Sequence, residues 1–458
     1  MTAATGASYA AGIVMLSAAS IIAGADPAPL VTVTGDLLPD WDIPVNQRLL
    51  IISKNQSWLS HGFHKYPAKF FPELPRWAIK RYSSEGETVL DPMAGSGTVN
   101  VEALLANRRS VAVDVDPFAR LLTRVKTTPL DVTILDRAVA AVLAELDAFE
   151  AGGAEARLVA ASHVPPFAYQ DTWFRPFILE ELGAIRAASA RIRDVIAPAD
   201  SGPYLDFIRI CLSSIVREVS NADNNCTRTV VRQRLQKRVV PGMAIRLFRR
   251  MLSVNVGRMR DFVPMVPSNA PVAVPENADA RAIPLPDESV DLAVTSPPYI
   301  NAVDYPRTHQ LEMYMLDLSP PGRPLAEAKR RHIGTEVVRA VDYRTLRTYG
   351  LPELDAQVES LFATDPRRAY IVHQYFVDME RNFREVQRTL KPGRHYVVVV
   401  GNNIIRNQVV PTHAYLLQVA ERVGFQVETY FASEVIRHYI KVPRKERINQ
   451  DWVLVLKR

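Results

Sequence analysis

Residues 295–299, Thr-Ser-Pro-Pro-Tyr, combine acceptor groups, a rigid backbone and an aromatic ring. Each proline fixes one φ angle and removes one backbone donor, so Pro297 and Pro298 hold the nearby carbonyls outward. The hydroxyl of Ser296 adds another acceptor, and the ring of Tyr299 can cover a flat ligand. We expect this segment to bind the exocyclic amino group of a planar base; a proline-rich turn without chemistry is the alternative.

A glycine-rich segment at residues 87–98, Glu-Thr-Val-Leu-Asp-Pro-Met-Ala-Gly-Ser-Gly-Thr, is the second candidate. Its pattern predicts a strand, a tight turn and a helix that continues to residue 105. Gly95 and Gly97 would let the backbone approach a ligand closely, and the helix amino terminus favours negative charge. The dinucleotide fingerprint Gly-x-Gly-x-x-Gly is absent, because position 100 is Asn.

Acidic side chains follow a second predicted strand, at residues 110–116. A carboxylate at that place suits the two hydroxyls of a ribose, as in other doubly wound nucleotide sites. We choose Asp114 for this role and keep Asp116 as its competitor. A surface acid without a ligand is the alternative for either residue.

These motifs resemble those of the amino-group DNA methyltransferases, and Ser-Pro-Pro-Tyr is the form typical of the cytosine-N4 branch. Residues 91–98 resemble the S-adenosylmethionine loop of that family, and residues 61–75 resemble the segment that closes over the methionine end of the cofactor. The similarity continues through residues 300–305 and 331–336 and through a predicted core strand at 396–400.

The resemblance implies a doubly wound α/β fold with a seven-stranded, Rossmann-like methyltransferase sheet, and S-adenosyl-L-methionine as the cofactor. It implies that Asp279 accepts a hydrogen bond from the adenine amino group. The catalytic residues it implies are Ser296, Pro297, Pro298 and Tyr299. The cofactor-binding residues it implies are Lys69, Phe70, Asp91, Met93, Ala94, Gly95, Gly97, Thr98, Asp114 and Asp279.

A long segment between the two halves of this resemblance is predicted to be helical and basic. We divide the chain into an N-terminal extension (1–50), a cofactor-binding half (51–130), an inserted helical region (131–275) and a catalytic half (276–458). Residues 226–260 contain ten Arg and Lys and no acid, which indicates contact with the DNA backbone. The predicted DNA-binding residues are Arg228, Arg232, Arg234, Lys237 and Arg238, and residues 437–447 are the next basic candidate. A solvated basic face is the alternative.

The composition agrees with a globular protein and narrows the chemistry. The net charge of +6 permits a polyanionic partner, and Cys211 and Cys226 provide neither a disulfide framework nor a metal site. Neither cysteine follows a proline, so carbon-5 cytosine methylation, which uses a Pro-Cys nucleophile, is disfavoured. The apolar residues 9–25 have no preceding Lys or Arg and are short for a membrane span. We expect a cytoplasmic, nucleoid-associated prokaryotic protein with no membrane contact and no metal.

The expected reaction is methylation of N4 of a cytosine flipped out of a specific sequence in double-stranded DNA. A role in restriction-modification, with a cognate endonuclease as a further partner, would suit such an enzyme. The nearest alternative is adenine-N6 methylation, in which Asp or Asn usually replaces Ser296. Two more distant hypotheses are methylation of a guanine amino group in RNA and a non-catalytic DNA-binding role.

Overall fold

A computed structural model describes residues 28–53, 55–232, 234, 237–268, 270–300, 304–319, 325–434 and 450–458. The apolar segment 9–25, residues 301–303 and the basic candidate 437–447 lie outside the described residues.

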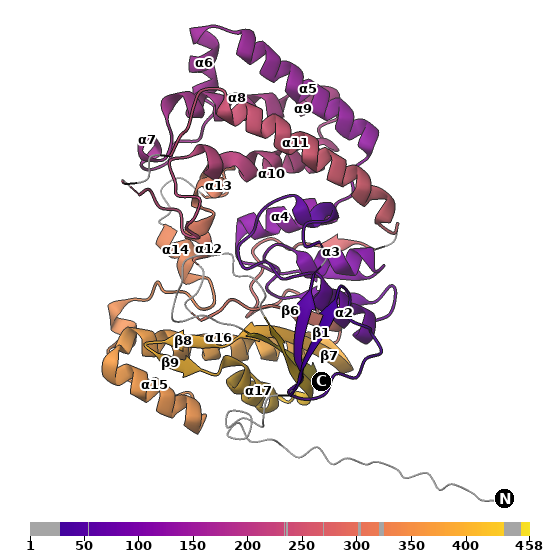
Figure 1. The fold of residues 1–458 in the computed structure, drawn as a ribbon, viewed down its shortest axis with the longest axis vertical. Coiled ribbons are helices and arrows are strands. Elements are labelled where there is room, and N and C mark those ends of the chain that lie inside the picture. Colours follow the sequence, from indigo (N-terminus) through magenta and orange to yellow (C-terminus); the bar gives the residue numbers. More distant parts are fainter. Residues whose placement is uncertain are drawn as a thin grey trace, which may run out of the picture.

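A twisted sheet forms the lower part of the molecule in Figure 1 and contains nine strands within the described residues. In spatial order, the strands are β1 (Leu30–Thr34), β2 (Arg48–Ile52), β10 (Gln426–Glu434), β11 (Gln450–Lys457), β7 (Leu390–Gly401), β6 (Val290–Thr295), β3 (Thr88–Asp91), β4 (Arg109–Ala112) and β5 (Val272–Ala273). All neighbours pair in parallel except β11, which is antiparallel to β7 and β10. The strands from β10 to β5 form the predicted doubly wound seven-stranded sheet, and β1 and β2 extend it at one edge.

The central strands are hydrophobic on both faces because helices cover both sides of the sheet. Every residue of β6 is buried. In β7, Val397 and Val399 face a core that contains α2 (Glu73–Tyr82) and α3 (Thr98–Leu105). Val398 and Val400 face the opposite core, with α16 (Pro366–Thr389) and α17 (Thr412–Val423). Period-two alternation along one strand thus divides its side chains between two helical layers.

A separate helical lobe stands above the sheet and has its own hydrophobic core (Figure 1). Its helices are α4 (Pro117–Thr127), α5 (Val132–Ala151), α6 (Ala154–Ala161), α7 (Gln170–Trp173), α8 (Pro176–Ala190), α9 (Ile192–Val195), α10 (Ser201–Val219) and α11 (Met243–Phe262). The mainly helical character expected for this region is present, whereas β5 lies within residues 131–275 and belongs to the sheet.

The segment after Tyr299 also joins this lobe. Leu311, Met313 and Met315, which belong to α13, are buried in the same core as α10. The remaining elements are η1 (Leu59–Gly62), η2 (Val263–Met265), α12 (Tyr305–Thr308), α13 (Gln310–Met315), α14 (Leu325–Arg330), η3 (Ala340–Tyr343), α15 (Pro352–Thr364) and the hairpin of β8 (Asn403–Ile405) and β9 (Gln408–Val410).

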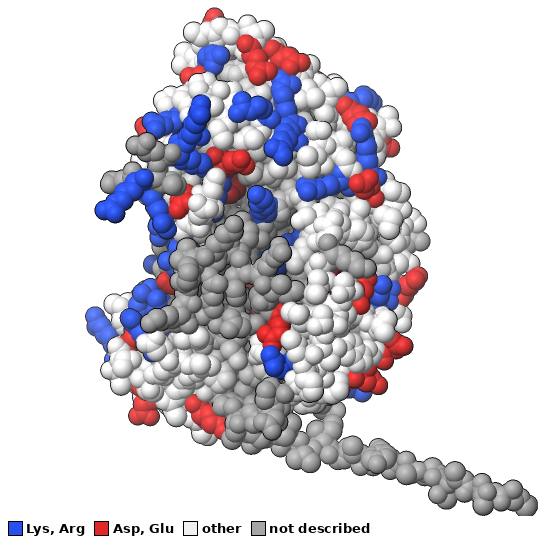
Figure 2. Space-filling model, viewed as in Figure 1, with Lys and Arg blue, Asp and Glu red and all other residues white. Residues whose placement is uncertain are grey.

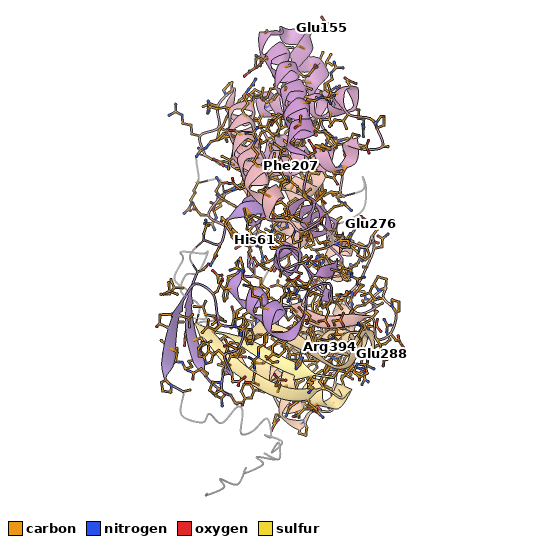
Figure 3. All side chains as sticks on the ribbon, turned by 90° about the vertical axis from the view of Figure 1, so that its right-hand side faces the viewer. His61, Glu155, Phe207, Glu276, Glu288 and Arg394 are labelled. Carbon is orange, nitrogen blue, oxygen red and sulfur yellow. The ribbon has the colours of Figure 1, made fainter. Side chains whose placement is uncertain are left out.

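The lobe is attached to the sheet through the residues that precede the glycine-rich segment. The ring of Phe63 packs against that of Phe207 of α10, with the ring centroids 5.5 Å apart. The backbone carbonyl of Phe63 accepts a hydrogen bond from Asn255 Nδ2 of α11. Figure 3 shows Phe207 and nearby His61 at this junction, far from Arg394 and Glu288 at the opposite end of the sheet. The lobe is therefore fixed directly above the carboxyl ends of the central strands.

Candidate active site

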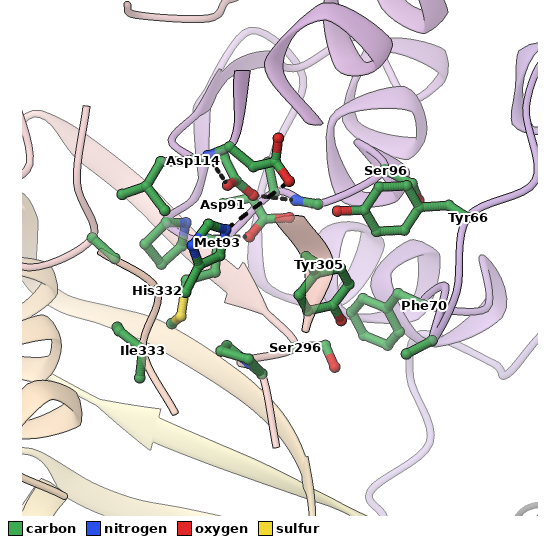
Figure 4. A pocket seen from close by; sticks show the side chains of 18 of the residues that line it. Tyr66, Phe70, Asp91, Met93, Ser96, Asp114, Ser296, Tyr305, His332 and Ile333 are labelled. Carbon is green, nitrogen blue, oxygen red and sulfur yellow. Dashed lines mark hydrogen bonds and ion pairs between the residues drawn. The ribbon is translucent and has the colours of Figure 1, made fainter. Parts of the chain in front are cut away.

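The carboxyl ends of β6, β3 and β4 meet at one edge of the sheet, where ligands of open α/β folds bind. An open cavity lies there (Figure 4). Eleven of the fourteen predicted catalytic and cofactor-binding residues line it: Lys69, Phe70, Asp91, Met93, Ala94, Gly95, Thr98, Asp114, Asp279, Ser296 and Pro298. Chain positions more than 200 residues apart therefore form one site.

The turn after β3 is held by carboxylates. Asp114 accepts hydrogen bonds from the backbone N–H of Gly95 and of Asp116, both at 2.8 Å. Burial raises the pKa of Asp114, and the neighbouring Asp116 adds to this effect. The acid predicted to bind ribose thus also fixes the glycine turn to the end of β4.

The two glycines of the turn have different roles. Gly95 has a φ of 51°, and a Cβ there would lie 3.6 Å from the ring of Tyr66, which lines the cavity. Gly97 has a φ of 70° and does not line the cavity. A Cβ at position 97 would lie 2.7 Å from the Thr123 hydroxyl of α4. Helix packing and backbone conformation require glycine at 97, rather than the close ligand approach that the sequence suggested.

Two of the four Ser-Pro-Pro-Tyr residues, Ser296 and Pro298, line the cavity, and the other two do not. The hydroxyl of Ser296 and the carbonyl of Pro297 receive no hydrogen bond from the described residues; Ser296 lines the cavity, whereas Pro297 does not. Pro297 itself is buried. Tyr299 does not line the cavity; its hydroxyl donates to Asp451 Oδ1 of β11 at 2.9 Å. The ring is thus tied to the antiparallel strand of the sheet.

The segment at residues 61–75 contributes Tyr66, Ala68, Lys69 and Phe70 to one wall of the cavity. Lys69 lines it and donates from Nζ to the backbone carbonyl of His61 at 3.1 Å, and burial lowers the pKa of Lys69 to about 8. His61 Nε2 lies 2.8 Å from Glu102 Oε1 of α3, and Arg76 Nε donates to Glu102 Oε2 at 2.7 Å. This buried contact fixes the wall to the helix that follows the glycine turn.

Asp279 also lines the cavity and is already paired. Arg281 donates to it from Nε at 2.9 Å and from Nη2 at 2.8 Å. Burial alone would raise the pKa of Asp279, but the hydrogen bonds from Arg281 outweigh it, and the pKa is lowered. Asp279 is therefore an ionised acceptor at the edge of the cavity.

Several lining residues had no role in the sequence-based prediction. Tyr66 stacks on Tyr305 with ring centroids 5.7 Å apart, and both rings face the cavity. Arg331, His332 and Ile333 approach from the far side. The sequence signal was present, because all five lie in stretches that resemble the family, but only the fold shows that these stretches meet.

The predicted DNA-binding residues lie outside the cavity, and three of them have intramolecular partners. Arg228 pairs with Glu336 at 3.2 Å, and Arg232 pairs with Asp223 at 3.1 Å. Lys237 donates to the backbone carbonyls of Arg217 and Ala222 and to Asn224, and burial lowers the pKa of Lys237 to about 8.

The other two predicted residues, Arg234 and Arg238, are exposed and have no ion-pair partner within the described residues. The same is true of Arg246 and Arg250 of α11. Figure 2 shows Lys and Arg side chains over the helical lobe, with acidic side chains among them. The basic block is therefore partly a set of internal ion pairs and partly an available cationic surface.

Within the part of the chain that the structure describes, no helix has the length and apolarity needed to cross a bilayer. No group of three His, Cys, Asp or Glu side chains among those residues is arranged to hold a metal ion.

A family model described as DNA methylase, for N6 and N4 amino methyltransferases, matches residues 40–123. The chain is 25% identical over 415 residues to the type II methyltransferase M.MvaI of Kocuria varians, covering 87% of this chain and 88% of that one. It is 21% identical over 427 residues to the type II methyltransferase M.BsoBI of Geobacillus stearothermophilus, covering 83% and 81%.

Among solved structures, a DNA modification methylase from Thermus thermophilus complexed with S-adenosyl-L-methionine is 19% identical, covering 38% of this chain and 50% of that one. The TM-score of that match is 0.20.

Proposed function

Because the chain belongs to the amino-group DNA methyltransferase family, we propose that it methylates the exocyclic N4 of a cytosine turned out of duplex DNA. The observation that carries this proposal is the position of Ser296, which lines the same cavity as the glycine turn and whose hydroxyl has no hydrogen-bond partner among the described residues. A base bound at Ser296 would therefore lie beside the methyl donor.

The methyl donor is S-adenosyl-L-methionine, and the residues at the cavity fit it. Asp114 and Asp116 offer carboxylates for hydroxyl groups, and Met93, Phe70 and Ile333 offer apolar surface for a flat ring. Asp116 Oδ2 is buried without a hydrogen-bond donor in the described structure, so a ligand hydroxyl would satisfy it. When bound, the cofactor supplies a methyl group on an electrophilic sulfonium.

The protein's contribution to the reaction is to orient the amino group and to exclude water. The N4 lone pair of cytosine is delocalised into the ring, which makes the amine a poor nucleophile. Hydrogen bonds from its two N–H groups to the Ser296 hydroxyl and the Pro297 carbonyl would favour a pyramidal, more nucleophilic nitrogen. Positioning of this kind can supply much of the rate, and the nitrogen loses its proton only after it carries the methyl group.

The choice of cytosine over adenine rests on Ser296. A serine hydroxyl can accept a hydrogen bond from the amino group of cytosine, whereas Asp or Asn at this position is usual in the adenine-N6 branch. Tyr299 supplies the ring that we propose for stacking on the base. This role requires movement of the base toward Tyr299 or of the ring toward the cavity, since the ring does not line it.

The helical lobe is the proposed DNA-binding region. It stands above the cavity, and Arg234, Arg238, Arg246 and Arg250 offer exposed cations for phosphates. The relatives are type II methyltransferases, which supports a place in a restriction-modification system with a cognate endonuclease.

The identity of the methylated base can be tested directly. Purified protein is incubated with S-adenosyl-L-methionine and duplex DNA of mixed sequence, and the DNA is digested to nucleosides for mass spectrometry. We expect N4-methyldeoxycytidine, and its loss with Ser296→Ala. N6-methyldeoxyadenosine as the product would overturn the assignment to cytosine, and methylation of RNA in preference to DNA would overturn the substrate class.

A further inference from the structure

His332 lines the cavity but belongs to neither of the two motifs predicted to bind the cofactor. It follows α14 in the catalytic half of the chain and reaches across to the acids that follow β4. Figure 4 shows its ring at the cavity near Met93 and Asp114. A side chain from the catalytic half thus faces the cofactor-binding half.

The hydrogen bonding of His332 defines which ring nitrogen can bind a ligand. Nδ1 lies 2.9 Å from the backbone carbonyl oxygen of Ala328. A carbonyl can only accept, so Nδ1 carries the proton in this contact. In the neutral ring, Nε2 is then an acceptor, and this buried atom has no hydrogen-bond partner among the described residues.

Asp116 presents a second unsatisfied acceptor at the same place. Its Oδ1 accepts a hydrogen bond from the backbone N–H of Phe118 at the start of α4. Its Oδ2 is buried, has no partner in the described structure and lies 4.0 Å from His332 Nε2. This distance is too long for a direct hydrogen bond. With the His332 ring neutral, two buried acceptors therefore face one another, and both need donors.

The loop that carries His332 is held on both sides. The carbonyl of Arg331 accepts a hydrogen bond from Arg281 Nη2 at 2.8 Å, and Arg281 is also paired with Asp279. Gly334 has a φ of 75°, and a Cβ there would lie 2.8 Å from the backbone oxygen of Tyr299. The loop thus packs against the cavity wall at one end and against the catalytic motif at the other.

We infer that His332 is a further cofactor-binding residue, whose Nε2 accepts a hydrogen bond from one ribose hydroxyl while the carboxylate of Asp116, beside Asp114, accepts from the other. The two vicinal hydroxyls of a ribose are adjacent donors. They would satisfy the two facing acceptors, His332 Nε2 and Asp116 Oδ2. The cofactor would then bridge the two halves of the chain and hold the His332 loop against Tyr299. This inference rests on the use of S-adenosylmethionine and not on the choice of base.

The test is calorimetry without DNA, using S-adenosylhomocysteine and its 2′-deoxy and 3′-deoxy analogues. Removing one hydrogen bond should make His332→Phe bind S-adenosylhomocysteine about 10-fold more weakly. His332→Gln retains an acceptor and should lose less. His163→Phe, a substitution of an exposed histidine in the helical lobe, is the matched control and should bind as the wild type does. Thermal unfolding of each variant checks that it is folded.

The deoxy analogues separate hydrogen bonding from a change in shape. For the wild type, removing the hydroxyl that His332 contacts should weaken binding, and in His332→Phe this penalty should largely disappear for one of the two analogues. Wild-type affinity in a folded His332→Phe would overturn the inference. It would also be overturned if each deoxy analogue lost as much affinity in His332→Phe as in the wild type. A protein that binds the cofactor in this way but methylates adenine would refute the proposed base and leave the inference intact.

Discussion

Thr295 Oγ1 donates a 2.8 Å hydrogen bond to Asp91 Oδ1, and this contact joins the ends of β6 and β3 across 204 residues of chain. Asp91 begins the glycine turn, and Thr295 directly precedes Ser296. The same oxygen of Asp91 also accepts from the backbone N–H of Met93 at 3.1 Å. One buried carboxylate therefore sets the relative position of the two motifs that carry the chemistry.

Asp91 should make stability depend on pH. Burial raises the pKa of Asp91 from 3.8 to about 7, although hydrogen bonds from Thr295 and Met93 oppose the shift. The folded state therefore holds a proton that the unfolded state releases, so stability should fall as pH rises from about 4 to about 7. Asp91→Asn cannot lose a proton at this position, so the loss of unfolding free energy with rising pH should be smaller in this variant, by at most about 4 kcal/mol. Denaturant unfolding of both proteins at pH 5 and pH 8 measures it, and parallel curves would refute the assignment.

Tyr299 should contribute through its ring more than through its hydroxyl. Tyr299→Ala removes the proposed stacking surface, worth about 1–3 kcal/mol per base, and should reduce methyl transfer accordingly. Tyr299→Phe loses only the hydrogen bond to Asp451 and should retain most activity. Single-turnover rates on duplex DNA compare the variants, with cofactor affinity as the control that should not change. Wild-type turnover in Tyr299→Ala would show that the motif is only a turn.

The two glycines of the cofactor turn should respond differently to alanine. Gly97→Ala brings a Cβ against Thr123 at positive φ and should destabilise the fold by roughly 1–2 kcal/mol or more. Adding Thr123→Ala should restore part of the loss, because the contacting side-chain atoms are removed. Gly95→Ala meets only Tyr66, at 3.6 Å, so we expect a smaller stability loss from backbone strain and a larger loss of affinity for S-adenosylhomocysteine. Equal effects on stability and binding at the two positions would contradict this division.

The exposed arginines should contribute more to DNA binding than the paired ones. Arg234→Gln with Arg238→Gln should reduce the log–log salt slope of DNA affinity by about 0.9 for each phosphate that is no longer neutralised. Arg228→Gln with Arg232→Gln should change it less, because these side chains already pair with Glu336 and Asp223. Arg249→Gln, in which a residue paired with Asp147 and Glu150 is replaced, is the control. An unchanged slope with all five predicted residues, including Lys237, replaced by Gln would show that the block is a solvated face.

The sequence alone predicted the elements whose signal is local. The strand before the glycine turn, and the turn itself, follow directly from residue type and order, and the structure has strand β3 at Thr88–Asp91; the mainly apolar residues 290–294 form most of strand β6. The helices at α5, α8 and α10 follow from apolar periodicity, and that periodicity also identified the inserted lobe as helical. The family resemblance added the expected roles of Ser296 and Asp91, because such roles depend on a short, ordered motif.

The tertiary structure decided what depends on contacts between distant segments. No local pattern shows that β1 and β2 extend the sheet, that Thr123 occupies the space beside Gly97, or that Glu336 neutralises Arg228. The facing acceptors of Asp116 and His332 are likewise 4.0 Å apart only because the sheet brings the end of β4 to the loop after α14. Sequence spacing fixes which groups an element carries, whereas packing between elements fixes which groups meet and which are left to bind a ligand.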